Sequence, residues 1–218
     1  FFFQSPRSCF DHLRNGAKRS GVYHIHSNKN TIYKVYCDLQ SEPNFAWTLV
    51  MSHTLENVVL PSFRSIVLGV NSPVNSQWPR WDAYRLSLDE MKYFRSVSTH
   101  WRITCNFDTE PLQYRDYVRA KFTEFDAISF IGRGTCKRVE RINVRGHECK
   151  DCTVGWYQSI SPFKNILSHD SSKNICEFGS TPGYVSSEDN FGMYGKFNRN
   201  FRCTASQSST TNLWFGIN

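Results

Sequence analysis

The chain has 218 residues and a net charge of +7, from 26 Lys and Arg against 19 Asp and Glu. Aromatic residues make up 15% of it, which excludes a disordered chain because such chains are poor in aromatic residues. No run of about 18 apolar residues is present, so we expect no membrane span in this sequence. The positive charge favours acidic partners, and no nucleic-acid-binding motif accompanies it, so we expect no nucleic acid partner.

Short elements and turns alternate over the first fifty residues. Residues 9–16 end on a glycine and are typical of a short helix. Residues 21–26 and 31–38 alternate apolar and polar side chains, which predicts an antiparallel hairpin with its turn at residues 27–30. Residues 45–51 are mainly apolar and predict a buried third strand.

The middle of the chain predicts one helix and two strands. Residues 86–94 suit a helix, because Ser87 can cap it and Glu90 stands three residues later, the spacing of a capping box. Residues 101–107 and 117–125 alternate apolar and polar side chains and predict strands.

From residue 132 on, Gly, Pro, Ser and Asn are frequent and regular periods are short. We therefore expect a loop-rich C-terminal half, held by cysteines more than by secondary structure. The polar stretch 204–212 is typical of a loop or a fraying end. Together the elements indicate an α+β fold class that is rich in antiparallel strands and long loops.

Eight cysteines are dispersed along the chain. They are Cys9, Cys37, Cys105, Cys136, Cys149, Cys152, Cys176 and Cys203. An even, dispersed count indicates a disulfide framework formed in an oxidising compartment, so we expect a secreted, extracellular protein. The alternative is a set of reduced thiols in a cytosolic protein, where this density of cysteine is rare.

Cys149 and Cys152 form a C-x-x-C pair with His147 just before it. Such a pair can be half of a zinc site or a redox centre, but the sequence offers neither a second close pair nor a thioredoxin-like context. We interpret both residues as structural half-cystines. Sequence does not fix the other pairings. The simplest ones in chain order are Cys105–Cys136 and Cys176–Cys203.

Four segments near the N-terminus carry a family pattern: Cys9, residues 20–25 (SGVYHI), residues 35–39 (VYCDL) and residues 45–50 (FAWTLV). Together they resemble the opening of fibrinogen-related domains, whose pattern is C…SGVYxI…VYCDM…GGWTVIQ. The resemblance covers about a quarter of the chain. It implies a disulfide between Cys9 and Cys37, which would lock the first helix onto the hairpin.

The rest of the chain departs from that family. Phe45 and Ala46 replace a glycine pair, and both the EFWLGN segment and the calcium loop of closely spaced aspartates are missing. The resemblance leaves two readings. One is a divergent, complete fibrinogen-like globe; the other is a fibrinogen-like start joined to a different C-terminal region, as in intelectin-type lectins. We expect a single fibrinogen-like domain over 1–218, with an N-terminal subdomain at 9–50 and a divergent remainder at 51–218.

Glu188 and Asp189 stand in a polar stretch at the general place of the family's calcium loop. They are our candidate calcium ligands, and Ca²⁺ is the one cofactor that the resemblance implies. Ca²⁺ usually takes six to eight oxygen ligands, so the alternative is a solvated turn.

Residues 137–145 concentrate four cations in nine positions. If this segment is a strand, Lys137, Arg141 and Arg145 share one face. With Arg138 they form a candidate site for the sulfate or carboxylate groups of an acidic macromolecule. The alternative is an ordinary solvated face.

No catalytic motif is present: the sequence has no nucleophile elbow, no zinc-protease helix and no phosphate loop. We expect a non-enzymatic recognition domain, and the resemblance implies a pocket in the C-terminal half for glycans or for acetylated or acidic groups. The alternative is a structural or adhesive protein of an extracellular matrix, because the C-terminal half is distantly similar to secreted skeletal-matrix proteins of stony corals. Four aromatic residues are candidate sugar-stacking faces: Trp156, Tyr157, Tyr184 and Tyr194.

Overall fold

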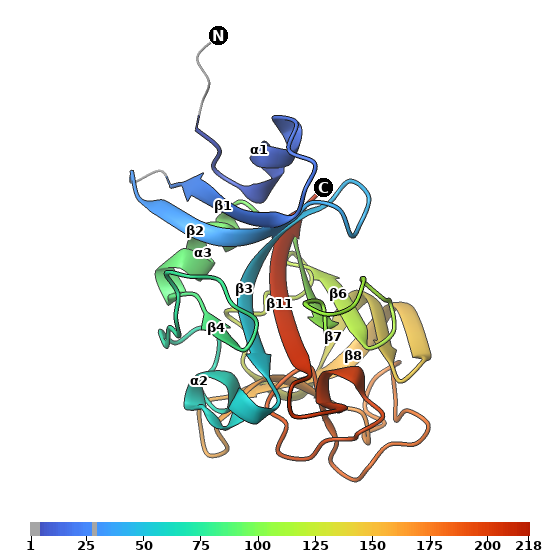
Figure 1. Ribbon diagram of the computed structural model, residues 1–218. Helices are drawn as coiled ribbons and strands as arrows, with labels where there is room; N and C mark the ends of the chain where they lie inside the picture. The colour runs from blue at the N-terminus through green and yellow to red at the C-terminus, as the bar shows by residue number, and fades with distance from the viewer. Residues whose placement is uncertain (1–4, 28–29) are drawn as a thin grey trace.

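The computed structural model describes residues 5–27 and 30–218. Within these ranges eleven strands form one sheet in the order β1-β2-β3-β11-β5-β6-β7-β8-β9-β10, and β4 pairs with β3 outside that path. All pairs of neighbouring strands are antiparallel. Figure 1 shows the last strand, β11, running through the middle of the molecule beside β3. The predicted α+β class, rich in antiparallel strands and disulfides, is confirmed.

Every helix and strand predicted before residue 126 is present, with ends that differ by a few residues. In chain order the elements are α1 (Cys9–Arg14), β1 (Gly21–His26), β2 (Ile32–Asp38), β3 (Ala46–Thr54), the 3-10 turn η1 (Glu56–Val59), α2 (Pro61–Arg64), β4 (Ala83–Arg85), α3 (Leu88–Ser96), β5 (His100–Cys105) and β6 (Tyr117–Lys121). The turn predicted at residues 27–30 includes residues 28 and 29, which lie outside the described residues.

The capping box predicted for α3 is present. The Ser87 side chain accepts a hydrogen bond from the Glu90 backbone N–H at 3.3 Å, and the Glu90 carboxylate accepts one from the Ser87 backbone N–H at 2.8 Å. Two backbone donors that the helix itself cannot satisfy are thereby paired, which fixes where α3 begins.

The expectation of a loop-rich C-terminal half was wrong for its first part. The elements there are β7 (Gly132–Val144), β8 (His147–Ser159), β9 (Asn165–Asp170), β10 (Asp189–Asn190), the 3-10 turn η2 (Arg202–Thr204) and β11 (Thr210–Ile217). β7 and β8 have 13 residues each. No side chain is buried in the first seven residues of β7 (132–138) or in the first five of β8 (147–151), so the apolar alternation that marks a half-buried strand is missing there. Loops dominate only after β8.

The loop expected at residues 204–212 was also wrong at its end. Thr210, Thr211 and Asn212 are buried in β11, which lies between β3 and β5. The Asn212 amide donates to Ser52 at 2.9 Å and accepts from the Thr104 hydroxyl at 3.2 Å. These polar side chains therefore tolerate burial because neighbouring strands supply their hydrogen bonds.

Four disulfides are present: Cys9–Cys37, Cys105–Cys203, Cys136–Cys176 and Cys149–Cys152. The first is the pairing that the resemblance implies. The pairings Cys105–Cys136 and Cys176–Cys203, expected from chain order, were wrong. β11 pairs with β5, so η2 is brought to the end of β5 although it is far away in the sequence.

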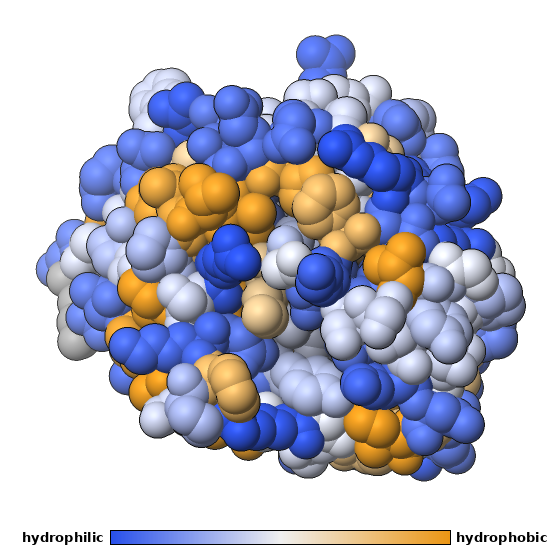
Figure 2. Space-filling model, turned by 90° about the horizontal axis from the view of Figure 1, so that it is seen from below, coloured by the Kyte–Doolittle hydropathy of each residue, from blue (hydrophilic) through white to orange (hydrophobic). Residues whose placement is uncertain are grey.

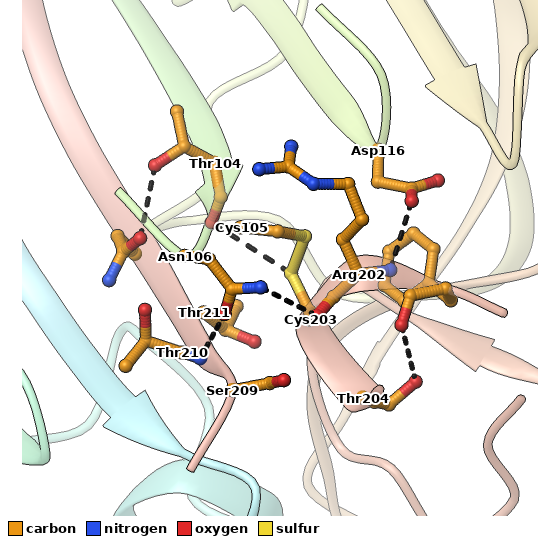
Figure 3. Close-up of a disulfide and its surroundings, with 12 residues drawn as sticks. Thr104, Cys105, Asn106, Asp116, Arg202, Cys203, Thr204, Ser209, Thr210 and Thr211 are labelled. Carbon is orange, nitrogen blue, oxygen red and sulfur yellow. Dashed lines mark hydrogen bonds between the residues drawn. A yellow bond between two sulfur atoms is a disulfide. The ribbon is translucent and has the colours of Figure 1, made fainter. Parts of the chain in front are cut away.

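Figure 3 shows the bridge between the end of β5 and η2. The Asn106 side chain beside it donates to the Arg202 carbonyl at 3.2 Å and accepts from the Thr210 N–H at 2.9 Å. Asp116 accepts from the Arg202 N–H at 2.9 Å. The disulfide is thus set in a network that ties the last loop to the sheet.

A buried ion network joins the N-terminal quarter to the central strands. The Arg102 guanidinium donates to Asp38 and to Glu42, each at 2.6 Å, and all three side chains are almost fully buried. The same guanidinium lies 4.5 Å from the Trp47 ring centroid and 5.0 Å from that of Trp214. The charges are paired and the rings cover them, which is how a protein interior accepts such groups.

Candidate functional site

A pocket of about 230 Å³ opens between β8, β9 and β10 and the loop that follows β10. Its lining residues are Arg133, Tyr157, Phe163, Asn165, Ser168, Asp170, Asp189 and Met193. Pockets for drug-sized ligands hold roughly 300–1,000 Å³, so this one suits a small group. It combines two carboxylates, a guanidinium, and amide and hydroxyl groups with aromatic and thioether surface.

Two carboxylates lie opposite each other on neighbouring strands at the pocket. Asp170 on β9 and Asp189 on β10 are direct partners in the antiparallel register. Burial raises the pKa of Asp189 to about 6, and the charge of Asp170 adds to this effect. One Asp189 oxygen accepts from the Lys196 N–H at 2.8 Å, and one Asp170 oxygen accepts from the Ser172 N–H at 2.8 Å. At neutral pH the pair attracts hydrogen-bond donors and cations and disfavours anions.

Aromatic and polar side chains complete the pocket. Phe163 is 73% exposed, and the Arg133 guanidinium lies 5.1 Å from its ring centroid. Burial raises the pKa of Tyr157, with a further contribution from the charge of Asp170, so its hydroxyl keeps its proton and remains a donor. Apolar surface beside a few placed polar groups is the usual composition of a small-ligand site.

The loop after β10 places Met193 in the pocket wall. A Cβ at Gly192 would lie 2.2 Å from the Leu167 carbonyl oxygen, so only glycine allows this approach to β9. Phe191, Met193 and Tyr194 all have positive φ, between 49° and 67°. Non-glycine residues seldom adopt this region, and here buried Phe191 and Tyr194 hold the loop in it.

The two predicted calcium ligands, Glu188 and Asp189, have different surroundings. Glu188 is fully buried and forms an ion pair with Arg145, and its carboxylate also accepts from the Val185 N–H at 3.0 Å and the Asn190 amide at 2.9 Å. Only Asp189 lines the pocket. Among the described residues, no group of three or more His, Cys, Asp or Glu side chains is arranged to hold a metal ion. The geometry favours an internal ion pair over a calcium ligand at Glu188.

The predicted basic row is largely neutralised. Arg145 was wrongly expected to continue the strand, because β7 ends at Val144 and Arg145 lies in the turn to β8 with φ 53°. Its guanidinium is turned inward to Glu188. The other two arginines of the row have acidic partners as well: Arg138–Asp151 at 3.2 Å and Arg141–Glu148 at 2.9 Å. Lys137 is also on β7, with its Nζ 5.8 Å from the Phe130 ring centroid.

The four aromatic candidates also have different places. Trp156 and Tyr194 are buried in the core, and Tyr184 is 49% exposed outside the pocket lining. Tyr157 alone of the four lines the pocket. Sequence reasoning missed Phe163 and Asp170, because no local motif connects them to Asp189. The signal that finds them is the β9–β10 register, which is not visible in the sequence.

Figure 2 shows the end of the molecule where α2 and the C-terminal loops lie, with apolar patches set among hydrophilic side chains. No helix among the described residues is long and apolar enough to cross a membrane. The four disulfides agree with the oxidising compartment expected from the cysteine count.

Comparison with known proteins gives one family match. Residues 5–57 match the family described as fibrinogen beta and gamma chains, C-terminal globular domain. Among solved structures, the chain is similar to the fibrinogen-like globe domain of human ANGPTL2, with 13% sequence identity, a TM-score of 0.41, and coverage of 96% of this chain and 97% of that one. No curated protein sequence matches the chain. The family match confirms the resemblance to fibrinogen-related domains that the sequence shows near its N-terminus, over residues 5–57.

Proposed function

We propose that this chain is a secreted recognition domain that binds glycans through the pocket between β8, β9 and β10. The chemistry of the lining carries the proposal. Asp170 and Asp189 accept hydrogen bonds from sugar hydroxyl or amino groups, and the apolar surfaces of Phe163 and Met193 cover one face of the ring. Fibrinogen-like domains are generally non-enzymatic binding modules, which supports recognition over catalysis.

The pocket favours neutral or amino sugars over acidic ones. Two carboxylates and one guanidinium, that of Arg133, line the pocket, so the net like charge opposes the binding of an anionic group. The prediction of acidic ligands therefore receives no support at this pocket, whereas glycans with free hydroxyl, amino or acetamido groups fit it. A structural or adhesive role in an extracellular, mineral-associated matrix stays a separate prediction.

We also propose that residues 1–218 work as one domain. What supports this is the continuous sheet, in which β3 of the N-terminal quarter pairs directly with β11 from the end of the chain. The pocket and the family-matched segment then belong to the same body.

The proposal is tested by calorimetric titration with glucosamine, N-acetylglucosamine and glucuronic acid. We expect the first two to bind and glucuronic acid to bind at least about tenfold more weakly, which corresponds to roughly 1.4 kcal/mol. Asp170→Asn should weaken glucosamine binding, while Asp151→Asn, which alters an exposed carboxylate outside the pocket, serves as the matched control. Preferred binding of glucuronic acid, or equal effects of the two variants, would contradict the proposal.

A further inference from the structure

A second concave surface lies around α1, at the upper end of the molecule in Figure 1 near the C-terminus. It consists of two hollows of about 440 and 360 Å³, whose linings share Arg7, Asp11 and Arg14. Because they share these residues, we describe them as one α1 groove. It shares no residue with the pocket at β8–β10.

The groove is lined by cations without acidic partners. Arg7 and Arg14 are exposed, and neither forms an ion pair with any residue of the described chain. Lys18 and Arg19 follow α1 and are likewise exposed and unpaired within the described ranges. Residues 5–20 thus carry four cations against one carboxylate, that of Asp11.

The Asp11 carboxylate already accepts a hydrogen bond from the backbone. One Asp11 oxygen accepts a hydrogen bond from the Arg7 backbone N–H at 2.8 Å, so the Arg7 guanidinium stays available. The predicted basic row differs, since each of its arginines, Arg138 and Arg141 on β7 and Arg145 in the turn after it, has an acidic partner. The unpaired positive charge of the protein is therefore concentrated at α1 more than on β7.

Apolar surface lies beside these charges. Phe10 on α1, Val97 after α3 and Ile217 at the end of β11 belong to the lining of the larger hollow. A polysaccharide presents sugar rings and charged substituents in alternation, so it can use apolar surface and cations along one groove. A guanidinium also matches the paired oxygens of a sulfate or carboxylate group with two parallel hydrogen bonds.

We propose that the α1 groove binds the sulfate and carboxylate groups of an acidic polysaccharide, with Arg7 and Arg14 as the principal contacts. This site is distinct from the glycan pocket and selects the opposite charge. The two surfaces together would let one domain hold an acidic matrix polymer while the pocket stays open.

The probe for the experiment is a heparin hexasaccharide, titrated into the 218-residue chain at three salt concentrations. We expect the double variant Arg7→Ala, Arg14→Ala to weaken binding at least about tenfold and to flatten its salt dependence. The matched control is Lys137→Ala, Arg138→Ala, which removes the same charge from the predicted row and should change affinity less than about twofold. Replacing both arginines by lysine should restore only part of the affinity.

Three outcomes would overturn the proposal. The unaltered chain binds no hexasaccharide; both double variants lose affinity equally, so that only net charge matters; or poly-glutamate binds as tightly as the hexasaccharide, so that the groove does not select a polysaccharide. Circular dichroism and the melting temperature check that the variants are folded.

Discussion

The N-terminal quarter and the loops after β8 are held in place by different means. In the first, Arg102 ties Asp38 and Glu42 to the aromatic core, and a disulfide with a sequence separation of 28 fastens α1 to β2. In the second, little regular structure remains, and long-range disulfides and buried carboxylates fix the chain. The family match covers the first region, whereas the second supplies most of the lining of the candidate pocket, together with Arg133 on β7 and Tyr157 on β8.

Buried carboxylates hold the loops where strand pairing is missing, and one of them, Asp116, lies directly before β6. Asp116 is fully buried, and accepts from the Arg145 N–H at 2.5 Å and the Arg202 N–H at 2.9 Å. Burial raises the pKa of this carboxyl, although the two backbone hydrogen bonds oppose the effect. Glu188 gathers loop donors in the same way.

The disulfides offer the largest test of this contrast. Removing Cys105–Cys203, with a sequence separation of 98, by substituting both cysteines with alanine should destabilise the protein by about 4–5 kcal/mol. Removing Cys149–Cys152, with a separation of 3, should cost only about 2 kcal/mol, because a short loop restricts the unfolded chain less. Denaturant unfolding measures both. Equal losses would show that loop closure does not account for how the second region is held.

The next-largest loss of stability is expected from breaking the buried ion network of Arg102, Asp38 and Glu42. Arg102→Leu should cost about 3–5 kcal/mol, because Asp38 and Glu42 would remain buried without their cation. The control is Arg138→Leu, which breaks an exposed pair with Asp151 and should cost less than about 1 kcal/mol. Urea unfolding compares the two variants. A loss of under 1 kcal/mol for Arg102→Leu would mean that packing alone holds this region.

Each of the two regions contains a buried histidine that makes the stability of the protein depend on pH. Burial lowers the pKa of His53 on β3 and of His169 on β9 to about 4. Because the unfolded chain binds these protons near pH 6.5, each neutral histidine contributes stability that is present above that pH and lost as the pH falls towards 4. The loss is about 3 kcal/mol for each.

His169→Gln should therefore reduce the difference in unfolding free energy between pH 7 and pH 4 by about 3 kcal/mol. The His169 Nδ1 pairs with the Gly155 carbonyl at 2.9 Å, and a glutamine amide can make a similar bond. His53→Gln should have a similar effect on the N-terminal side. An unchanged pH profile in either variant would show that the histidine does not stay neutral in the folded protein.

The smallest effect concerns binding alone. Asp189→Asn should lower the affinity for glucosamine by about tenfold at pH 7.5, and by less at pH 5, where the native Asp189, with a pKa of about 6, is already mostly protonated. Titration calorimetry at the two pH values measures this. A loss that is the same at both pH values would remove Asp189 from the recognition of the amine.

The elements predictable from sequence were those with local signals. The capping box of Ser87 and Glu90 involves neighbours in sequence, and the alternation in β1 and β2 reports a half-buried face. β7 and β8 were not predicted because each begins with a stretch in which no side chain is buried, residues 132–138 and 147–151. The start of β11 was not predicted because it contains polar residues such as Asn212, whose side chain is hydrogen-bonded to neighbouring strands.

The candidate site was less predictable than the fold. Tyr157 was identified as an aromatic candidate, and Asp189 only as a candidate calcium ligand at the place of the family's calcium loop. Their common pocket depends on the register that places Asp170 opposite Asp189. Arg145 and Glu188 were each assigned to a ligand, whereas they bind each other across 43 positions of sequence. Pairings over such separations are set by the sheet order, which local patterns do not contain.

The central claim, that the pocket beside β9 and β10 is the recognition site, is tested most directly by methyl NMR. The chain has three methionines: Met193 lines the pocket, while Met51 and Met91 are buried in the core and serve as internal controls. Glucosamine added to protein carrying ¹³C-methyl methionine should shift the Met193 signal in a saturable way and leave the other two unchanged. No shift at Met193 despite binding measured by calorimetry would place the recognition site elsewhere.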